Sequence, residues 1–310
     1  EEIPVAGKDV LSYVKENADS SSTDVITVPG ISNDSCTYTL AYDGTSDNNL
    51  RYVGSNPCNY VTFNGEKAGW RIIGILNTPE GQRMKLIRTD SIGNYSWDYT
   101  STGRYINDWT TGTLQTLLNS GAYYNRTTGQ YYNNSTTATT LDFTNNGLTE
   151  TAKSQIDTIT WKLGGTASYD SSSNGLASHW YTYERGTTVY TGRPTEWQGK
   201  VGLMYPSDYG YATSGGTSMN RASCLAKELY KWDGASDCYN NNWIYNSSTT
   251  QWTLAPDSSY SDRVFAVFLT GLVSNGYAFP QGAVRPSVYL IPSTSILGGE
   301  GTLENPYTIG

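Results

Sequence analysis

The stretch Tyr60-Val-Thr-Phe-Asn-Gly-Glu-Lys-Ala-Gly-Trp-Arg-Ile-Ile-Gly-Ile-Leu76 carries the strongest β signal in this chain of 310 residues. Two runs rich in β-branched and aromatic residues, 60–63 and 70–76, flank the dipeptide Asn64-Gly65. Asn-Gly readily adopts the left-handed backbone that a tight hairpin turn requires. A second turn at 78–81 leads into Met84-Lys-Leu-Ile-Arg88. We therefore predict a meander of three strands.

Short helices and strands are expected around this meander. Asp9 is a suitable N-cap for a helix that places Val10, Leu11 and Val14 on one face. Further helices are predicted through Leu114, Leu117 and Leu118, over 149–163 and over 222–232, with a turn at 206–208. Further strands are predicted at 25–28, 38–42, 51–54, 201–205, 243–245, 252–254, 264–268, 273–278 and 284–291.

The fold class that this pattern predicts is α+β, with an irregular mixed or antiparallel sheet, short helices and long loops. We expect two parts. Residues 1–48 form an N-terminal arm with a short helix and a strand. Residues 49–310 form a single α+β core domain with long loop insertions at 122–147, 166–198 and 257–283.

The composition excludes several classes of protein. Charged residues make up 15% of the chain, against about 25% in an ordinary domain, and the net charge is −8. With 26 tyrosines the chain has too much apolar surface to be disordered. It has no basic stripe, so we expect no nucleic-acid partner. No apolar run approaches the roughly 20 residues of a membrane span, so no transmembrane segment is predicted.

Four cysteines, Cys36, Cys58, Cys224 and Cys238, indicate two disulfides. Three connectivities are possible, and we prefer the local pairs Cys36 with Cys58 and Cys224 with Cys238. Disulfides persist in oxidising surroundings. The chain begins with Glu1 instead of Met, so we expect a removed secretory signal peptide, with trimming as the alternative. An extracellular location follows.

No catalytic residue is predicted, and we expect the protein not to be an enzyme. His179 is the only histidine, and no Gly-x-Ser-x-Gly nucleophile motif accompanies it. The alternative is a carbohydrate-active enzyme that uses a pair of carboxylates. Five carboxylates are candidates for such a pair, although nothing in the sequence pairs them: Asp90, Asp98, Glu184, Glu196 and Asp208.

We predict no cofactor, and the sequence locates no metal site. None of the cysteines lies in a Cys-x-x-Cys motif, which argues against zinc. Asp43, Thr45, Asp47 and Asn49 have the alternate spacing of an EF-hand calcium loop. However, Asn48 stands where that loop needs glycine, and Gly54 stands where it needs the bidentate glutamate. Calcium bound in another way stays open.

The segment 258–282 is the predicted contact surface. Its aromatic residues Tyr260, Phe268, Tyr277 and Phe279 alternate with small polar residues, a composition typical of recognition surfaces. The alternative is that Phe279 belongs to the core. The partner would be a host protein or glycan, or other copies of this chain.

Several motifs occur together and in order over residues 49–309. They include Asn59-Tyr-Val-Thr-Phe-Asn64, Trp70-Arg-Ile-Ile-Gly74, Gly202-Leu-Met-Tyr-Pro-Ser-Asp-Tyr-Gly-Tyr-Ala212 and Val284-Arg-Pro-Ser-Val-Tyr-Leu290. In these motifs the chain resembles a family of uncharacterised secreted or surface proteins of Gram-positive bacteria. The resemblance implies a bacterial cell-surface or secreted location and transfers no activity.

A more distant resemblance is to the C-type-lectin-like fold of formylglycine-generating-enzyme-like domains. It implies that strands at 70–76 and 284–290 pair with each other. The catalytic cysteines and metal ligands of that enzyme have no counterpart in this sequence. The combined prediction is a non-enzymatic bacterial extracellular surface protein. Its role would be adhesion or ligand binding, self-assembly into a surface filament or layer, or both.

Overall fold

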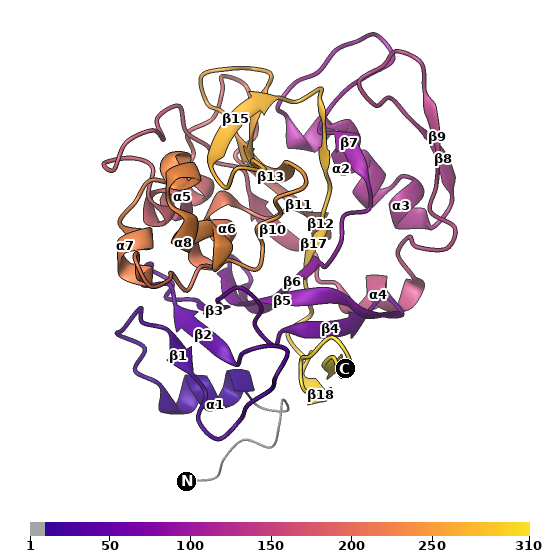
Figure 1. Cartoon of the computed structure of the whole chain (residues 1–310). Coiled ribbons are helices and arrows are strands. Elements are labelled where there is room, and N and C mark those ends of the chain that lie inside the picture. The colour runs from indigo at the N-terminus through magenta and orange to yellow at the C-terminus, as the bar shows by residue number, and fades with distance from the viewer. Residues whose placement is uncertain (1–9) are drawn as a thin grey trace.

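The computed structural model describes residues 10–310 and contains short helices and several small β-sheets around one large hydrophobic core and a small second cluster (Figure 1). This arrangement confirms the predicted α+β class. Asp9, the predicted N-cap, lies outside the described residues, as does the start of the predicted arm. None of the helices in the described part has the length and hydropathy needed to cross a bilayer.

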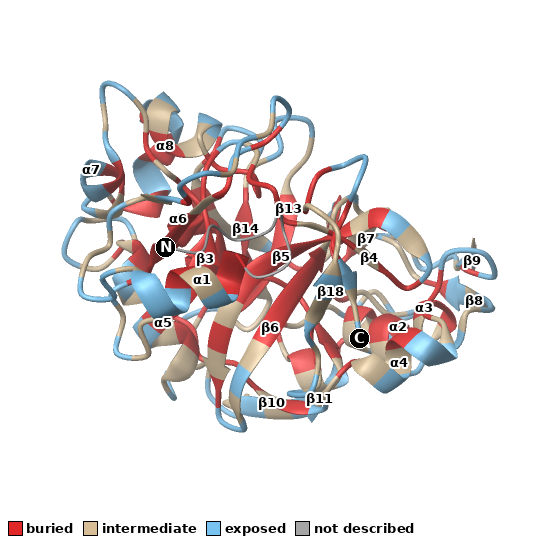
Figure 2. Cartoon of the chain, turned by 90° about the horizontal axis from the view of Figure 1, so that it is seen from below, coloured by how far each residue is buried: buried red, intermediate tan, exposed pale blue. Residues whose placement is uncertain are grey.

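The largest sheet has eight strands in the order β1-β2-β3-β5-β6-β17-β12, with β4 also paired to β5. Its strands are β1 (Ile26–Thr27), β2 (Thr39–Tyr42), β3 (Leu50–Tyr52), β4 (Tyr60–Phe63), β5 (Glu66–Thr78), β6 (Gly81–Arg88), β12 (Val201–Gly202) and β17 (Ser287–Tyr289). The meander β4-β5-β6 confirms the prediction from 60–88, and Asn64 and Gly65 have the positive φ angles of its turn. Figure 2 shows β5 and β6 buried in the middle of the molecule.

A second sheet of five strands has the order β15-β14-β13-β16-β7, and three further hairpins complete the β structure. The strands of the second sheet are β7 (Asn94–Ser96), β13 (Gln251–Pro256), β14 (Arg263–Val267), β15 (Val273–Tyr277) and β16 (Gln281–Ala283). The hairpins are β8 (Thr128–Tyr131) with β9 (Thr139–Asp142), β10 (Ile159–Lys162) with β11 (Glu196–Gly199), and β18 (Ile296–Gly298) with β19 (Thr308–Ile309).

Eight α-helices occur in residues 10–310, each of nine residues or fewer. They are α1 (Val10–Asn17), α2 (Thr113–Asn119), α3 (Ala122–Asn125), α4 (Glu150–Gln155), α5 (Ala177–Arg185), α6 (Pro206–Tyr211), α7 (Arg221–Leu225) and α8 (Ser236–Asn240). The apolar faces predicted for α1 and α2 are buried. Isolated helices this short are marginal, so packing against the sheets must stabilise them.

The helix predicted over 149–163 is wrong beyond Gln155. Thr149 caps α4 as expected, but the chain then forms strand β10, in which Ile159 and Trp161 are buried and alternate with Thr160 and Lys162. The two-residue periodicity and the pairing to β11 therefore make residues 159–162 a strand instead of a helix. The predicted turn at 206–208 is the first turn of α6, and residues 243–245 form no strand.

The segments expected as long loop insertions contain regular structure. Residues 122–147 include α3 and the β8–β9 hairpin, and Tyr123, Tyr131 and Phe143 in this segment are buried. Residues 166–198 contain α5, and 257–283 contain β14, β15 and β16. Strands β14 and β15 agree with the strands predicted at 264–268 and 273–278. In 122–147 and 166–198 the polar composition hides the regular elements, because only a few side chains of each segment reach the core.

The pairing expected from the lectin-like resemblance is displaced by one strand. Strand β17 pairs with β6, through Val288 opposite Leu86, and not with β5. Both predicted disulfides, Cys36–Cys58 and Cys224–Cys238, are present, which confirms the local connectivity. The first joins the segment between β2 and β1 to the segment before β4, and the second joins α7 to α8.

Gly74 allows strand β3 to approach β5 closely. It lies opposite Arg51 of β3 on one side and opposite Lys85 of β6 on the other. A Cβ atom at this position would overlap the backbone carbonyl oxygen of Leu50. A β-bulge between Ile72 and Gly74 sets this register with β6. The glycine is therefore required by the spacing of the sheet.

We predict that Gly74→Ala lowers the free energy of unfolding by at least about 2 kcal/mol, because β3 must move away from β5. The matched control is Gly276→Ala in β15, where an added Cβ meets no atom within 4 Å. That variant should change stability by less than about 1 kcal/mol. Urea denaturation of both variants tests this, and equal effects would contradict the close approach.

Candidate functional site

A row of residues crosses the large sheet and carries two buried cations. Arg51, Gly74, Lys85 and Tyr289 are successive register partners on β3, β5, β6 and β17. Residues directly opposite one another in antiparallel strands project from the same face of the sheet. The row therefore presents the Arg51 guanidinium and the Lys85 ammonium to one face, separated by a position without a side chain.

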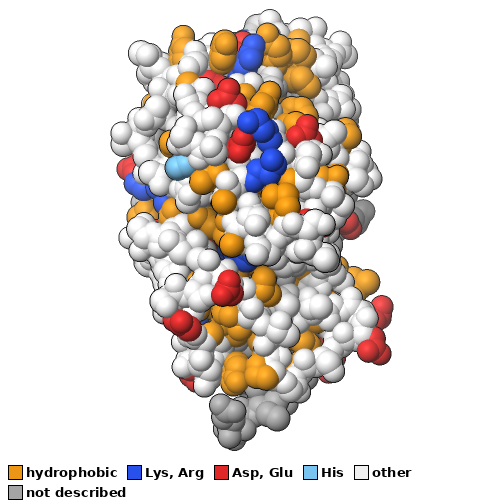
Figure 3. Space-filling model, turned by 60° about the vertical axis from the view of Figure 1, so that its left-hand side comes forward, with side chains coloured by type: hydrophobic (Ala, Val, Ile, Leu, Met, Phe, Trp, Pro, Cys, Tyr) orange, Lys and Arg blue, Asp and Glu red, His pale blue; other side chains and the backbone are white. Residues whose placement is uncertain are grey.

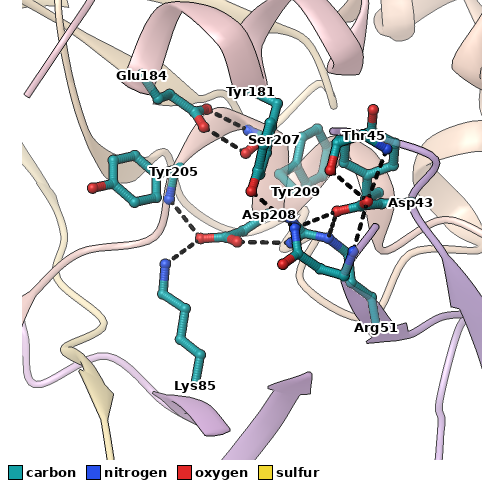
Figure 4. A network of polar contacts seen from close by, with 12 residues as sticks. Asp43, Thr45, Arg51, Lys85, Tyr181, Glu184, Tyr205, Ser207, Asp208 and Tyr209 are labelled. Atoms are coloured by element: carbon teal, nitrogen blue, oxygen red, sulfur yellow. Dashed lines mark hydrogen bonds and ion pairs between the residues drawn. The ribbon is translucent and has the colours of Figure 1, made fainter. Parts of the chain in front are cut away.

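Asp208 of α6 bridges the two cations (Figure 4). Its Oδ1 accepts from Arg51 Nη1 at 2.9 Å and its Oδ2 accepts from Lys85 Nζ at 2.6 Å. The backbone N–H of Tyr205 also donates to Oδ2, at 2.8 Å, so the carboxylate caps the start of α6. Arg51 has a second carboxylate partner, Asp43, at 2.9 Å. Two cations and two anions are thus balanced inside the protein.

Opposing effects act on the pKa of each member of this ion cluster. Burial alone would raise the pKa of Asp208, but Lys85 and Arg51 lower it to about 2. Burial also tends to raise the pKa of Asp43, which Arg51 and its hydrogen bonds bring below the usual value. Burial lowers the pKa of Lys85 more than Asp208 raises it. Paired in this way, the charges avoid much of the cost of burial.

Glu184 of α5 is a third buried carboxylate, next to this cluster. It accepts from the backbone N–H of Ser207 at 2.8 Å, from the Ser207 hydroxyl at 2.6 Å and from Arg185 Nη1 at 3.1 Å. Burial raises the pKa of Glu184 to about 7, and Arg185 and Ser207 offset only part of that rise. This carboxyl group changes its protonation state near neutral pH.

The segment with EF-hand-like spacing forms a turn that protein donors fill. Asp43 Oδ1 accepts from the backbone N–H groups of Thr45 and Asn49 and from the Thr45 hydroxyl, while Oδ2 bonds Asn49 and Arg51. These donors occupy the oxygens that would otherwise ligate a cation. Over residues 10–310, no group of three or more His, Cys, Asp and Glu side chains is placed to hold a metal ion.

The five carboxylates considered for catalysis lie in different environments. Glu184 and Asp208 flank Ser207 and are fully engaged in the interior. Asp98 is buried and accepts from the backbone N–H groups of Ile106 and Thr113. Asp90 is exposed, and Glu196 is exposed and paired with Lys162. His179 accepts from the backbone N–H of Leu176 at 3.2 Å, which is a capping role in α5.

A pocket of about 220 Å³ opens beside the ion cluster. Its residues come from α5, β10, β17, the end of β5 with the turn that follows it, the segment just before α6, and the loop after Asp43. They are Asp47, Asn77, Thr78, Pro79, Ile159, Thr160, Lys162, Arg185, Tyr205 and Tyr289. None of the five carboxylates above lines this pocket. Its wall combines two aromatic rings with a guanidinium, amide, hydroxyl and carboxylate groups.

The predicted contact residues divide between the two ends of the β14–β15 hairpin. Tyr277 pairs with Arg263 at one end, whereas Phe268 follows β14 at the other and packs against the core. At about 3.4 Å per residue, the two ends are roughly 15 Å apart. Tyr260 and Tyr277 are exposed, and Phe279 is half-buried. Phe268 therefore does not share a surface with the other three.

Tyr99 and Tyr105, which the sequence did not single out, join the three at the exposed end. We call Tyr99, Tyr105, Tyr260, Arg263, Tyr277 and Phe279 the aromatic patch. Ring centroids are 6.2 Å apart for Tyr99 and Tyr105, 4.8 Å for Tyr105 and Phe279, and 5.5 Å for Tyr277 and Phe279. The Arg263 guanidinium lies 4.0 Å from the Tyr260 ring centroid and 4.9 Å from that of Tyr277.

We predict that Glu184→Gln removes part of the pH dependence of stability. The native carboxyl binds its proton with a pKa of about 7, against 4.5 as its ordinary value. As pH rises from 4.5 towards 7, the unfolded chain loses this proton first, so Glu184 lowers native stability progressively in that window. Between pH 5 and pH 7 the free energy of unfolding should therefore fall by about 2 kcal/mol less in the variant than in the native protein.

Urea denaturation of both proteins at pH 5, 6 and 7 provides the measurement. Gln keeps the acceptor for Ser207 but does not titrate, and all other groups contribute equally to both curves. Parallel pH profiles for the two proteins would show that Glu184 does not titrate in this range.

Comparison of the chain with protein-family profiles, with curated proteins and with solved structures finds no match in any of the three. The resemblances to a surface-protein family of Gram-positive bacteria and to the C-type-lectin-like fold therefore stay proposals.

Proposed function

We propose that this protein is a non-enzymatic extracellular surface protein of a Gram-positive bacterium that binds a ligand through the aromatic patch. The observation that carries the proposal is the row of neighbouring rings on the exposed end of the β14–β15 hairpin. Tyr260 and Tyr277 keep 47% and 42% of their surface exposed although an aromatic side chain gains much from burial. Contact with a partner would bury that surface.

The patch is held in place before any partner binds. Asn107 is buried, and its side-chain amide donates to the backbone carbonyls of Asp257, Tyr260 and Arg263 at 2.8–2.9 Å. Arg193 donates to the Asn107 side chain and to the Ser261 carbonyl. These bonds fix the loop that carries Tyr260 against the segment that carries Tyr105. A rigid aromatic surface loses little conformational entropy on binding.

The composition of the exterior agrees with this role. Figure 3 shows a face on which charged side chains are sparse and hydrophobic side chains are scattered among the other side chains and the backbone. Tyrosine faces with nearby hydroxyl and amide groups suit the stacking of sugar rings and equally suit a protein surface. The disulfides support an oxidising compartment. Self-assembly through the same patch is the alternative use of the surface.

We predict that the double variant Tyr260→Ala, Tyr277→Ala binds its ligand at least about tenfold more weakly than the native protein. A glycan array and an array of extracellular host proteins identify the ligand, and titration of the best hit measures its affinity. Because both side chains are exposed, stability should change by less than about 1 kcal/mol. Tyr230→Ala is the control, since Tyr230 has a similar exposure of 38% outside the patch.

Absence of binding on both arrays, or equal affinity of native and double-variant proteins, would contradict the ligand-binding proposal. Sedimentation velocity at high protein concentration tests the alternative, which is self-assembly through the aromatic patch. Assemblies that the double variant dissociates would assign the patch to contacts between copies.

A further inference from the structure

The pocket beside the ion cluster is separate from the aromatic patch and shares no residue with it. Its floor and walls are apolar where Ile159, Tyr205 and Tyr289 contribute, and all three are buried. Polar groups from Asp47, Asn77, Thr160, Lys162 and Arg185 stand around this apolar part. An apolar pocket with a few converging polar groups is the usual form of a small-molecule site.

Arg185 has unused hydrogen-bonding capacity in this pocket. Its Nη1 donates to Glu184 and to the Tyr181 carbonyl, at 3.1 and 3.3 Å. Its Nε and Nη2 make no hydrogen bond with any residue of the described chain, and the side chain is 21% exposed. An arginine with one edge of its fork free binds a carboxylate through two parallel hydrogen bonds.

The orientation of Arg185 is fixed by its neighbours. The guanidinium carbon lies 3.4 Å from the centroid of the Tyr181 ring and 5.5 Å from that of Tyr205. The Tyr181 hydroxyl in turn donates to Asp47 and accepts from Asn49. The fork therefore stands ready for a ligand, and little rotamer entropy is lost when it binds.

Further donors and acceptors around the pocket suit hydroxyl groups. The Tyr289 hydroxyl has no hydrogen-bond partner within residues 10–310, although the ring itself is buried. Asn77 donates its amide N–H to Asp47, which leaves the amide oxygen open, and a carboxylate such as Asp47 has more lone pairs than its two present bonds use. The pocket thus offers hydrogen-bond donors and acceptors beside aromatic rings, and such a surface can bind the hydroxyl groups of a sugar ring.

The charge balance limits the ligand to one negative charge. Glu184 lies directly behind Arg185, and Asp47 stands within the pocket wall. Lys162 is already paired with Glu196, at 2.5 Å. Arg185 is thus the cation that offers a free edge, and the Asp47 carboxylate in the wall repels a dianionic phosphate more than a ligand with one negative charge. A carboxylate, with a single charge and a planar shape that fits the fork, is favoured.

We propose that this pocket binds an acidic monosaccharide, a sugar ring that bears one carboxylate, such as a uronic acid. The carboxylate bonds the free edge of the Arg185 guanidinium. The ring packs against Tyr205 and Ile159, and its hydroxyls bond Tyr289, Asn77 and Asp47. The site does not depend on the aromatic patch, so either can fail without the other.

Titration of the full chain with D-glucuronate, followed by NMR, tests the proposal, with D-glucose as the neutral match. Glucuronate should saturate the protein in the millimolar range usual for a single sugar, and glucose should bind at least about tenfold more weakly. Arg185→Lys keeps the charge but loses the fork, so it should weaken glucuronate binding about tenfold or more. Arg104→Lys, at an exposed arginine outside the pocket, should leave it unchanged.

Tyr289→Phe is the second variant, because it removes a hydroxyl that bonds no described residue and should leave folding intact. We expect binding of glucuronate and glucose both to weaken several-fold in it, while their ratio is retained. Equal affinity for glucuronate and glucose in the native protein, no saturation by glucuronate, or native affinity in Arg185→Lys would each overturn the proposal.

Discussion

The fold depends on the buried bridge from Asp208 to Arg51 and Lys85. Removal of one member would leave a charge in the interior without its partner, which costs far more than a surface ion pair contributes. The bridge joins residues separated by 157 and 123 positions in the chain. It fixes α6 on the large sheet, and through Asp43 and Ser207 it also locates the 43–49 turn and α5. The tertiary position of these short elements follows from this one group of charges.

The structure gives two roles to the many aromatic residues of this chain, which has few charges. Several of those charges lie in the interior. Tyrosine and tryptophan rings lie beside the interior cations: Lys85 Nζ is 4.6 Å from the Tyr205 ring centroid and 5.0 Å from that of Tyr289, and the Arg71 guanidinium is 4.1 Å from that of Tyr60. The faces of these rings carry partial negative charge and replace some of the lost hydration. The remaining aromatic residues include the exposed rings of the patch.

The parts of the fold that could be predicted from the sequence are those that depend on local signals. Strands β4 to β6 follow from residue type and the Asn64-Gly65 turn, and both disulfides join cysteines close in sequence. Helix α5 lacks a strong apolar repeat. Ile156 and Ile159 fit a helical spacing, so the sequence predicts one helix where the structure has α4 followed by β10. Of the four residues predicted as a contact surface, Tyr260, Tyr277 and Phe279 lie near one end of the β14–β15 hairpin, and Phe268 lies at the other. Tyr99 and Tyr105 reach the Tyr277 end of the hairpin from a distant segment, and no local sequence pattern predicts this contact.

The ion cluster and the pocket were beyond prediction for a shared physical reason. Arg51, Lys85 and Tyr289 become neighbours only through strand register, which the bulge beside Gly74 sets. Arg185 is oriented by Tyr181, whose hydroxyl is held by the turn that Asp43 organises. The pocket thus takes its rigidity from the charges behind it. A binding group that such a network holds moves little, so it loses little conformational entropy when a ligand binds. The interactions that stabilise the fold therefore also favour binding at this kind of site.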